Sequence, residues 1–213
     1  MHWRGYIIGG VVIVCLAALF FVSPFLQDIF FLVIEDVGNF ASGNTGGSMV
    51  VFVLLAAVSV MLSPFSSTPI VPIATSLWGW ETAVALLLFG WFIGAIISYA
   101  IGFFAGHPIL RQFVGDEKAS SYEEYFLTRM TLIRAVLIRL ALPAEVGYAF
   151  GLIKYNIGMY LAATVVAEIP FAFITVHAAD AFIALKPIVF AGWILALAAL
   201  IGVSYFFFPK KAA

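Results

Sequence analysis

A permanent cation, a helix-breaking residue and a carboxylate follow one another within an apolar stretch, at Arg139, Pro143 and Glu145. On insertion scales an Arg in the bilayer core costs about 2.5–3.5 kcal/mol, and Pro removes a backbone donor and breaks a helix. Irregular backbone at membrane depth is tolerated only where protein or a water-filled cavity surrounds it. The three residues therefore predict a polar site inside a membrane, one that moves something across it.

Two more ionisable residues, Glu168 and Arg134, enter the same hypothesis. Arg139 is expected either to bind an anionic substrate group or to form a fixed structural ion pair with Glu145 or Glu168. These two carboxylates are also the candidates for proton coupling. Arg134 lies five residues before Arg139, about 140° away around a helix. It would therefore either line the site or extend to lipid headgroups.

Hydroxyl side chains mark a second break, at Ser66, Ser67 and Thr68. Thr68 before Pro69 is typical of a helix start, with Thr68 as the N-cap and Pro at the first helical position. The hydroxyls are expected to satisfy freed backbone groups, to bond a headgroup, or to do both. Pro143 would open another half-helix, and two such N-termini facing each other favour an anion.

The composition is that of an integral membrane protein. Of 213 residues, 64% are hydrophobic and 10% are charged, whereas a soluble domain has about 25% charged residues. The one cysteine excludes a disulfide framework or a thiol-based metal site. No catalytic or metal-binding motif is evident. We therefore expect no enzyme activity, metal, cofactor or nucleic-acid partner, and membrane lipids as the surroundings.

The apolar runs predict an all-helical protein with about four spans and two opposed re-entrant hairpins in an inverted repeat. Residues 1–47 would form a first span, near 6–26, and an amphipathic connector helix at 28–40. Residues 48–178 would form a core with hairpins near 49–78 and 131–153, each followed by a long helix. Residues 179–213 would form the last span and a basic tail. The alternative is two ordinary proline-kinked helices that span the membrane.

The distribution of Lys and Arg predicts the orientation. We expect a multi-pass protein of the plasma (inner) membrane with both termini in the cytoplasm. In this orientation most basic residues lie on the cytoplasmic side, and the acidic connector 27–47 lies outside. Lys186 alone would be on the outer side.

Small residues recur every fourth position in one long predicted helix, at Gly90, Gly94, Ser98, Gly102 and Gly106. Such a ridge lets another helix approach closely. We expect it to serve packing, with a homo-oligomer interface as the alternative.

Two segments resemble the DedA family, also called the VTT-domain or SNARE-associated Golgi protein family. The first is Arg139-Leu-Ala-Leu-Pro143 with Gly151 and Met159 after it. The second is the glycine-rich helix that runs from Gly94 to Gly106. The likeness covers roughly residues 48–178.

The resemblance implies movement of lipids across membranes, with undecaprenyl phosphate and phospholipids as substrates. It implies that Arg139 binds a lipid phosphate or gates its passage. The chain departs from the family pattern at two places. Ser and Thr stand where many members have an acidic residue in the first hairpin, and Glu145 stands where many have Arg.

The sequence therefore favours a flippase or scramblase of an anionic lipid, with coupling to an ion gradient left open. A proton-coupled exporter of small molecules is the first alternative. A non-transporting scaffold, in which Arg and Glu form a permanent ion pair, is the second.

Overall fold

The computed structural model describes residues 23–62, 67–106, 128, 130–141 and 146–207. Every regular element in these residues is helical, and they contain no strand. The predicted first span and the polar stretch 107–130 lie almost entirely outside the described residues. Pro143, Glu145 and Ser66 also lie outside them.

Two described helices are long and apolar enough to cross a membrane, Thr68–Gly106 and Ile157–Ile183. A third is added if the bent pair Glu35–Ala41 and Thr45–Met61 is counted as one span. A shorter apolar helix covers Pro187–Val203. Two or three candidate spans are thus established within the described chain.

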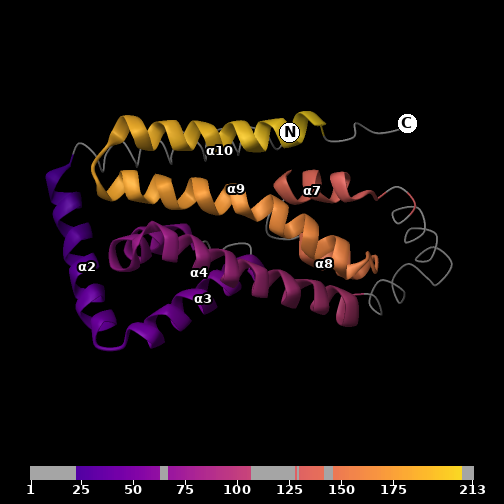
Figure 1. Cartoon of the computed structure of the whole chain (residues 1–213), viewed down its shortest axis with the longest axis horizontal. Helices are drawn as coiled ribbons and strands as arrows, with labels where there is room; N and C mark the ends of the chain where they lie inside the picture. The colour runs from indigo at the N-terminus through magenta and orange to yellow at the C-terminus, as the bar shows by residue number, and fades with distance from the viewer. Residues whose placement is uncertain (1–22, 63–66, 107–127, 129, 142–145, 208–213) are drawn as a thin grey trace.

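The connector predicted to be helical at 28–40 is a helix, α2 (Pro24–Ser42). It lies across one end of the helix bundle, roughly perpendicular to the long helices (Figure 1). The next helix, α3 (Thr45–Met61), turns by 117° from the end of α2. Asn44 caps α3 by accepting a hydrogen bond from the Gly47 backbone N–H at 3.0 Å.

Helix α3 ends at Met61, and the next described elements are a 3₁₀ turn, η1 (Thr68–Ile70), and α4 (Val71–Ile101). Ser67 is the residue at the N-cap of η1 and makes no capping bond, so the prediction of Thr68 as the cap is wrong. The tight turn begins one residue earlier than the Thr-Pro signal indicated. Gly79 divides α4 at φ 78° and ψ 164°, a conformation that glycine adopts without steric cost.

Helix α3 and the part of α4 before Gly79 form a first short helix pair. A second short helix pair, α7 (Leu132–Ala141) and α8 (Val146–Leu152), follows the polar stretch. The long helices α9 (Ile157–Ile183) and α10 (Pro187–Phe207) complete the chain. In Figure 1, α7 and α8 lie at the end of the bundle opposite α2. A π-helical turn, η2 (Gly102–Gly106), extends α4 toward that same end.

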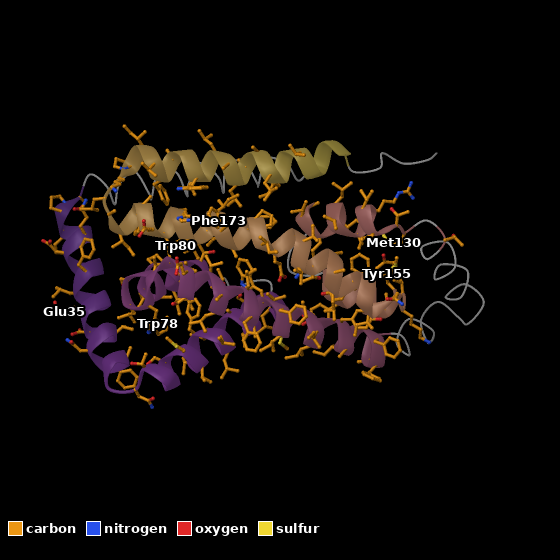
Figure 2. All side chains as sticks on the ribbon, viewed as in Figure 1. Glu35, Trp78, Trp80, Met130, Tyr155 and Phe173 are labelled. Atoms are coloured by element: carbon orange, nitrogen blue, oxygen red, sulfur yellow. The ribbon has the colours of Figure 1, made fainter. Side chains whose placement is uncertain are left out.

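Two hydrophobic cores of similar construction hold the long helices together. The first joins α3, both parts of α4 and the second half of α9, with Leu87 and Val176 fully buried. The second joins α7, α8, the later part of α4 and the first half of α9 around Tyr160. Figure 2 labels Trp78, which packs against the first core, Met130, which packs against the second, and Tyr155, which is part of the second. Each core is therefore built from one short helix pair, the part of α4 after Gly79 and one half of α9.

The glycine ridge packs within the chain, as predicted. A Cβ added at Gly90 or Gly94 would lie closer than 3.0 Å to backbone oxygens of α3. At Gly102 the clash would be with the backbone of α8, and Gly151 of α8 would clash in return with the backbone of α4. Both short helix pairs therefore pack against the same row of small residues on α4 and η2, which fixes their positions relative to each other.

Candidate functional site

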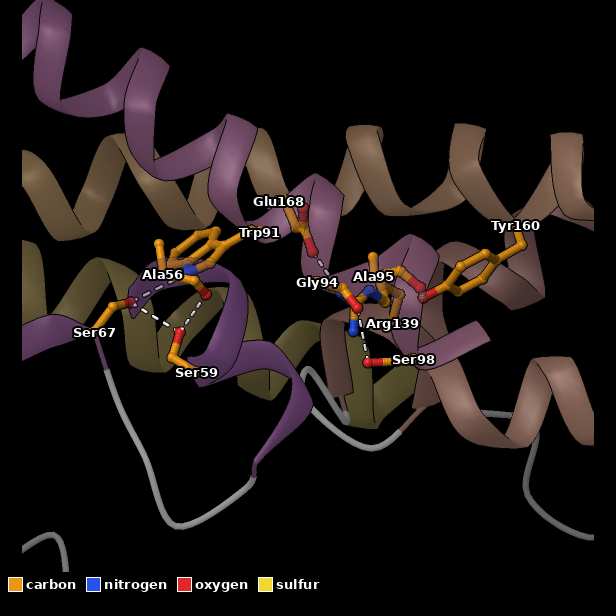
Figure 3. Close-up of polar contacts among 10 residues, drawn as sticks. All are labelled: Ala56, Ser59, Ser67, Trp91, Gly94, Ala95, Ser98, Arg139, Tyr160 and Glu168. Atoms are coloured by element: carbon orange, nitrogen blue, oxygen red, sulfur yellow. Dashed lines mark hydrogen bonds and ion pairs between the residues drawn. The ribbon is translucent and has the colours of Figure 1, made fainter. Parts of the chain in front are cut away.

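Arg139, at the end of α7, and Glu168, near the middle of α9, form a buried ion pair. The bond joins Arg139 Nη2 to Glu168 Oε1 (Figure 3). Arg139 is 2% exposed and Glu168 is 7% exposed. The sequence left Glu145 and Glu168 as alternative partners, and the structure gives the contact to Glu168.

The guanidinium uses only part of its hydrogen-bonding capacity. Among the described residues, Arg139 Nε and Nη1 have no hydrogen-bond partner, and neither does Thr164 Oγ1. A guanidinium carries five N–H donors in a planar fork that matches two oxygens of a carboxylate or phosphate. A buried donor without a partner costs about 1–3 kcal/mol. The site is therefore suited to accept a further oxyanion.

Polar residues of α9 lead up to the ion pair along one face of the helix. Tyr160, Thr164 and Glu168 are spaced by four residues, and all three are buried. Tyr160 donates to the Ala95 carbonyl of α4 at 3.3 Å. Sequence analysis missed Tyr160 and Thr164, although their helical spacing from Glu168 was a signal that would have found them.

Helix α8 packs against α4 beside Tyr160. Ser98 donates to the Gly94 carbonyl at 2.8 Å, within α4. A Cβ on Gly147 of α8 would come within 2.8 Å of both Ser98 Cβ and Tyr160 Oη. Glycine at 147 thus lets the start of α8 reach the face that carries Tyr160.

Ser67 organises the break between α3 and α4. Its hydroxyl lies 3.2 Å from Ser59 Oγ and accepts a hydrogen bond from Trp91 Nε1 at 3.2 Å. Ser59 Oγ also contacts the Ala56 carbonyl at 2.7 Å. Each hydroxyl has one proton, so a consistent arrangement runs from Trp91 to Ser67, then to Ser59 and to the Ala56 carbonyl. The Ser67 hydroxyl is therefore already engaged in holding this tip against α4.

Two hydrogen bonds from other parts of the chain reach neighbouring turns of α4. Trp91, which contacts the first tip, is one helical turn from Ala95, which accepts the bond from Tyr160. Tyr148 of α8 donates to the Met61 carbonyl at the end of α3, at 2.7 Å. The packing therefore couples the two short pairs directly.

The other predicted site residues lie apart from this centre. Thr68 is exposed at the start of η1. Arg134 is exposed near the start of α7, whereas Arg139 is buried at its end. The structure thus brings together Arg139 and Glu168 and positions Ser67 at the neighbouring tip.

Comparison with known proteins identifies the family. No curated protein and no solved structure matched the chain. The family model described as the VTT domain matches residues 39–181, more than half of the chain. This range includes both short helix pairs, the ion pair, the candidate span Thr68–Gly106 and all but the last two residues of Ile157–Ile183. The chain therefore belongs to the VTT-domain family, the DedA/SNARE-associated Golgi protein family to which its sequence was similar.

Proposed function

We propose that this protein translocates the headgroup of an anionic lipid, such as a phospholipid or undecaprenyl phosphate, across the membrane. It acts as a transporter of the flippase or scramblase type and not as an enzyme. The observation that carries the proposal is the buried guanidinium of Arg139, which bonds Glu168 through one nitrogen. Its other two nitrogens have no partner among the described residues.

The proposed arrangement has four crossings and two re-entrant hairpins that enter from opposite sides as an inverted repeat. It is supported by two short helix pairs that each precede a long segment, and by two cores of similar construction. Ser67, beside the first break, bonds Trp91 of α4, and Gly147, at the start of α8, packs against Ser98 of α4. Discontinuous helices that meet at the membrane midplane are typical of transporter binding sites.

The proposed orientation follows from charge. Arg134 on α7 and Lys154 in the loop between α8 and α9 are both exposed. Helix α2, at the opposite end of the bundle, has acidic residues and no Lys or Arg. Cytoplasmic loops of membrane proteins carry an excess of Lys and Arg. We therefore place the α8–α9 loop and both termini in the cytoplasm, and α2 at the outer surface of the plasma (inner) membrane.

The phosphate of the lipid would bind the unused N–H donors of Arg139. Charge-assisted hydrogen bonds of this kind offset part of the cost of removing a phosphate from water. The carboxylate of Glu168 competes for the same guanidinium. Protonation of Glu168 would release Arg139 to the phosphate, which provides a means of coupling to a proton gradient.

Lipid movement suits the few charges of the site. The hydrocarbon chains stay in the bilayer while only the headgroup passes the ion pair, so a wide aqueous channel is unnecessary.

The test is headgroup translocation in proteoliposomes with labelled phosphatidylglycerol and undecaprenyl phosphate. Wild type is compared with Arg139→Leu and with Lys186→Leu, which removes an exposed cation far along the chain from the ion pair. Translocation that is lost in folded Arg139→Leu and kept in Lys186→Leu supports the proposal. If wild type moves neither lipid, with or without a proton gradient, the proposal is wrong and a small-molecule exporter becomes the leading hypothesis.

A further inference from the structure

An apolar groove opens between α4 and α9 and ends at the ion pair. Its volume is about 380 Å³, and its walls include Ala85, Phe89, Phe92 and Val165. Glu168 is the one charged residue among the described residues that line it. Both helices belong to candidate membrane spans, and Ala85, Phe89 and Val165 in the groove are exposed among the described residues.

Glu168 belongs both to the buried ion pair and to the lining of the groove. Its carboxylate bonds Arg139 on the inner side, and the residue also forms part of the groove. It therefore separates the bilayer from a guanidinium that has unused donors. A molecule that moved from the bilayer toward Arg139 along this groove would meet Glu168 first.

The shape and chemistry of the groove specify an amphipathic occupant. Aromatic and aliphatic walls suit a hydrocarbon chain and offer little to an ion or a sugar, because an unpaired polar group in such surroundings is costly. The guanidinium of Arg139, which lies beyond Glu168, suits an anion. A lipid with a phosphate headgroup combines these two properties, and the bilayer supplies such molecules directly to the groove.

We propose that the α4–α9 groove is the lateral portal through which an anionic lipid reaches Arg139, with its chain along the groove and Glu168 as the barrier that it displaces. The proposal rests on lipid translocation as the function of the ion pair. It adds the route of access, the pair of helices that form it and the residue that closes it.

Filling the groove tests the route. Ala85→Trp places a large side chain at an exposed groove position, and Ala198→Trp makes the same change at an exposed position of α10 outside the groove. We expect Ala85→Trp to slow translocation of phosphatidylglycerol by about tenfold or more, because the headgroup can no longer be positioned at Arg139. Ala198→Trp should leave the rate unchanged. Equal rates in the two variants would overturn the proposed route.

Photolabelling tests occupancy separately from transport. Phosphatidylglycerol and diacylglycerol, each with a diazirine in one acyl chain, are incorporated into vesicles that contain the full-length protein. The labelled peptides are then mapped by mass spectrometry. We expect phosphatidylglycerol to label α4 and α9 around the groove more than diacylglycerol does. Arg139→Leu should reduce that labelling to the diacylglycerol level.

The two measurements separate the inference from the function on which it rests. Translocation by wild type with equal labelling by both probes would keep the function and overturn the portal, because the groove would then hold bilayer chains without regard to the headgroup. Selective labelling without any translocation would keep the lipid site and overturn the transport function.

Discussion

Replacing either member of the buried ion pair with leucine should destabilise the protein strongly. Removing one partner of a buried pair typically costs about 3–5 kcal/mol, because the remaining charge is left uncompensated. Arg139 and Glu168 are 2% and 7% exposed, so solvent does little to screen either charge. Glu168→Leu should cost at least as much as Arg139→Leu. A carboxylate can take up a proton, whereas a guanidinium stays charged.

Replacing both residues with leucine should restore most of the lost stability. Apolar substitution of a whole buried pair is often neutral or stabilising. For a chain of this size, each kcal/mol shifts Tm by roughly 2–4 °C. Each single variant should therefore unfold about 10 °C below wild type, and the double variant much closer to it.

Thermal unfolding of purified protein in detergent, followed by circular dichroism, measures these shifts. Arg139→Leu combined with Glu81→Leu is the control, because Glu81 is exposed and its effect should add to that of Arg139→Leu within about 0.5 kcal/mol. A double Arg139/Glu168 variant no more stable than the single variants would refute the coupling of the two charges. The stable double variant should also fail to translocate lipid. If it were active, Arg139 would not be the phosphate site.

Three further predictions concern the packing that positions the pair. Gly151→Ala should destabilise the protein by about 1–3 kcal/mol through overpacking against α4, whereas Gly192→Ala, with open space around its Cβ position, should not, as thermal unfolding will show. Ser67→Ala should lower the free energy of unfolding by about 1–3 kcal/mol because it leaves the partly buried Trp91 Nε1–H without its acceptor, and Ser76→Ala at an exposed position should have a smaller effect in the same assay. Tyr148→Phe removes the bond between the two short helix pairs. It should cost about 0.5–1.5 kcal/mol and speed hydrogen exchange at the end of α3, and unchanged exchange there would show that this bond does not couple the pairs.

Several features of the fold were predictable because their causes are local. Apolar runs predicted the helices at α9 and α10, and the spacing of small residues from Gly90 to Gly106 predicted close helix packing. The start after the first break was predicted one residue late. The Thr68-Pro69 signal was strong, yet the chain enters its 3₁₀ turn from Ser67, whose hydroxyl is held by Trp91. A contact across 24 residues is outside the reach of a local capping rule.

The sequence itself determined the membrane class, the helical architecture and the presence of a cation, Arg139, within an apolar run. An Arg inside an apolar run is too costly to be incidental, and hydrophobicity and helix breaks act over a few residues. The tertiary structure decided which carboxylate faces Arg139, which helices the glycine ridge receives and where a groove reaches the ion pair. Arg139 and Glu168 are 29 residues apart. Their contact depends on how α7 packs against α9, which no pattern along the chain specifies.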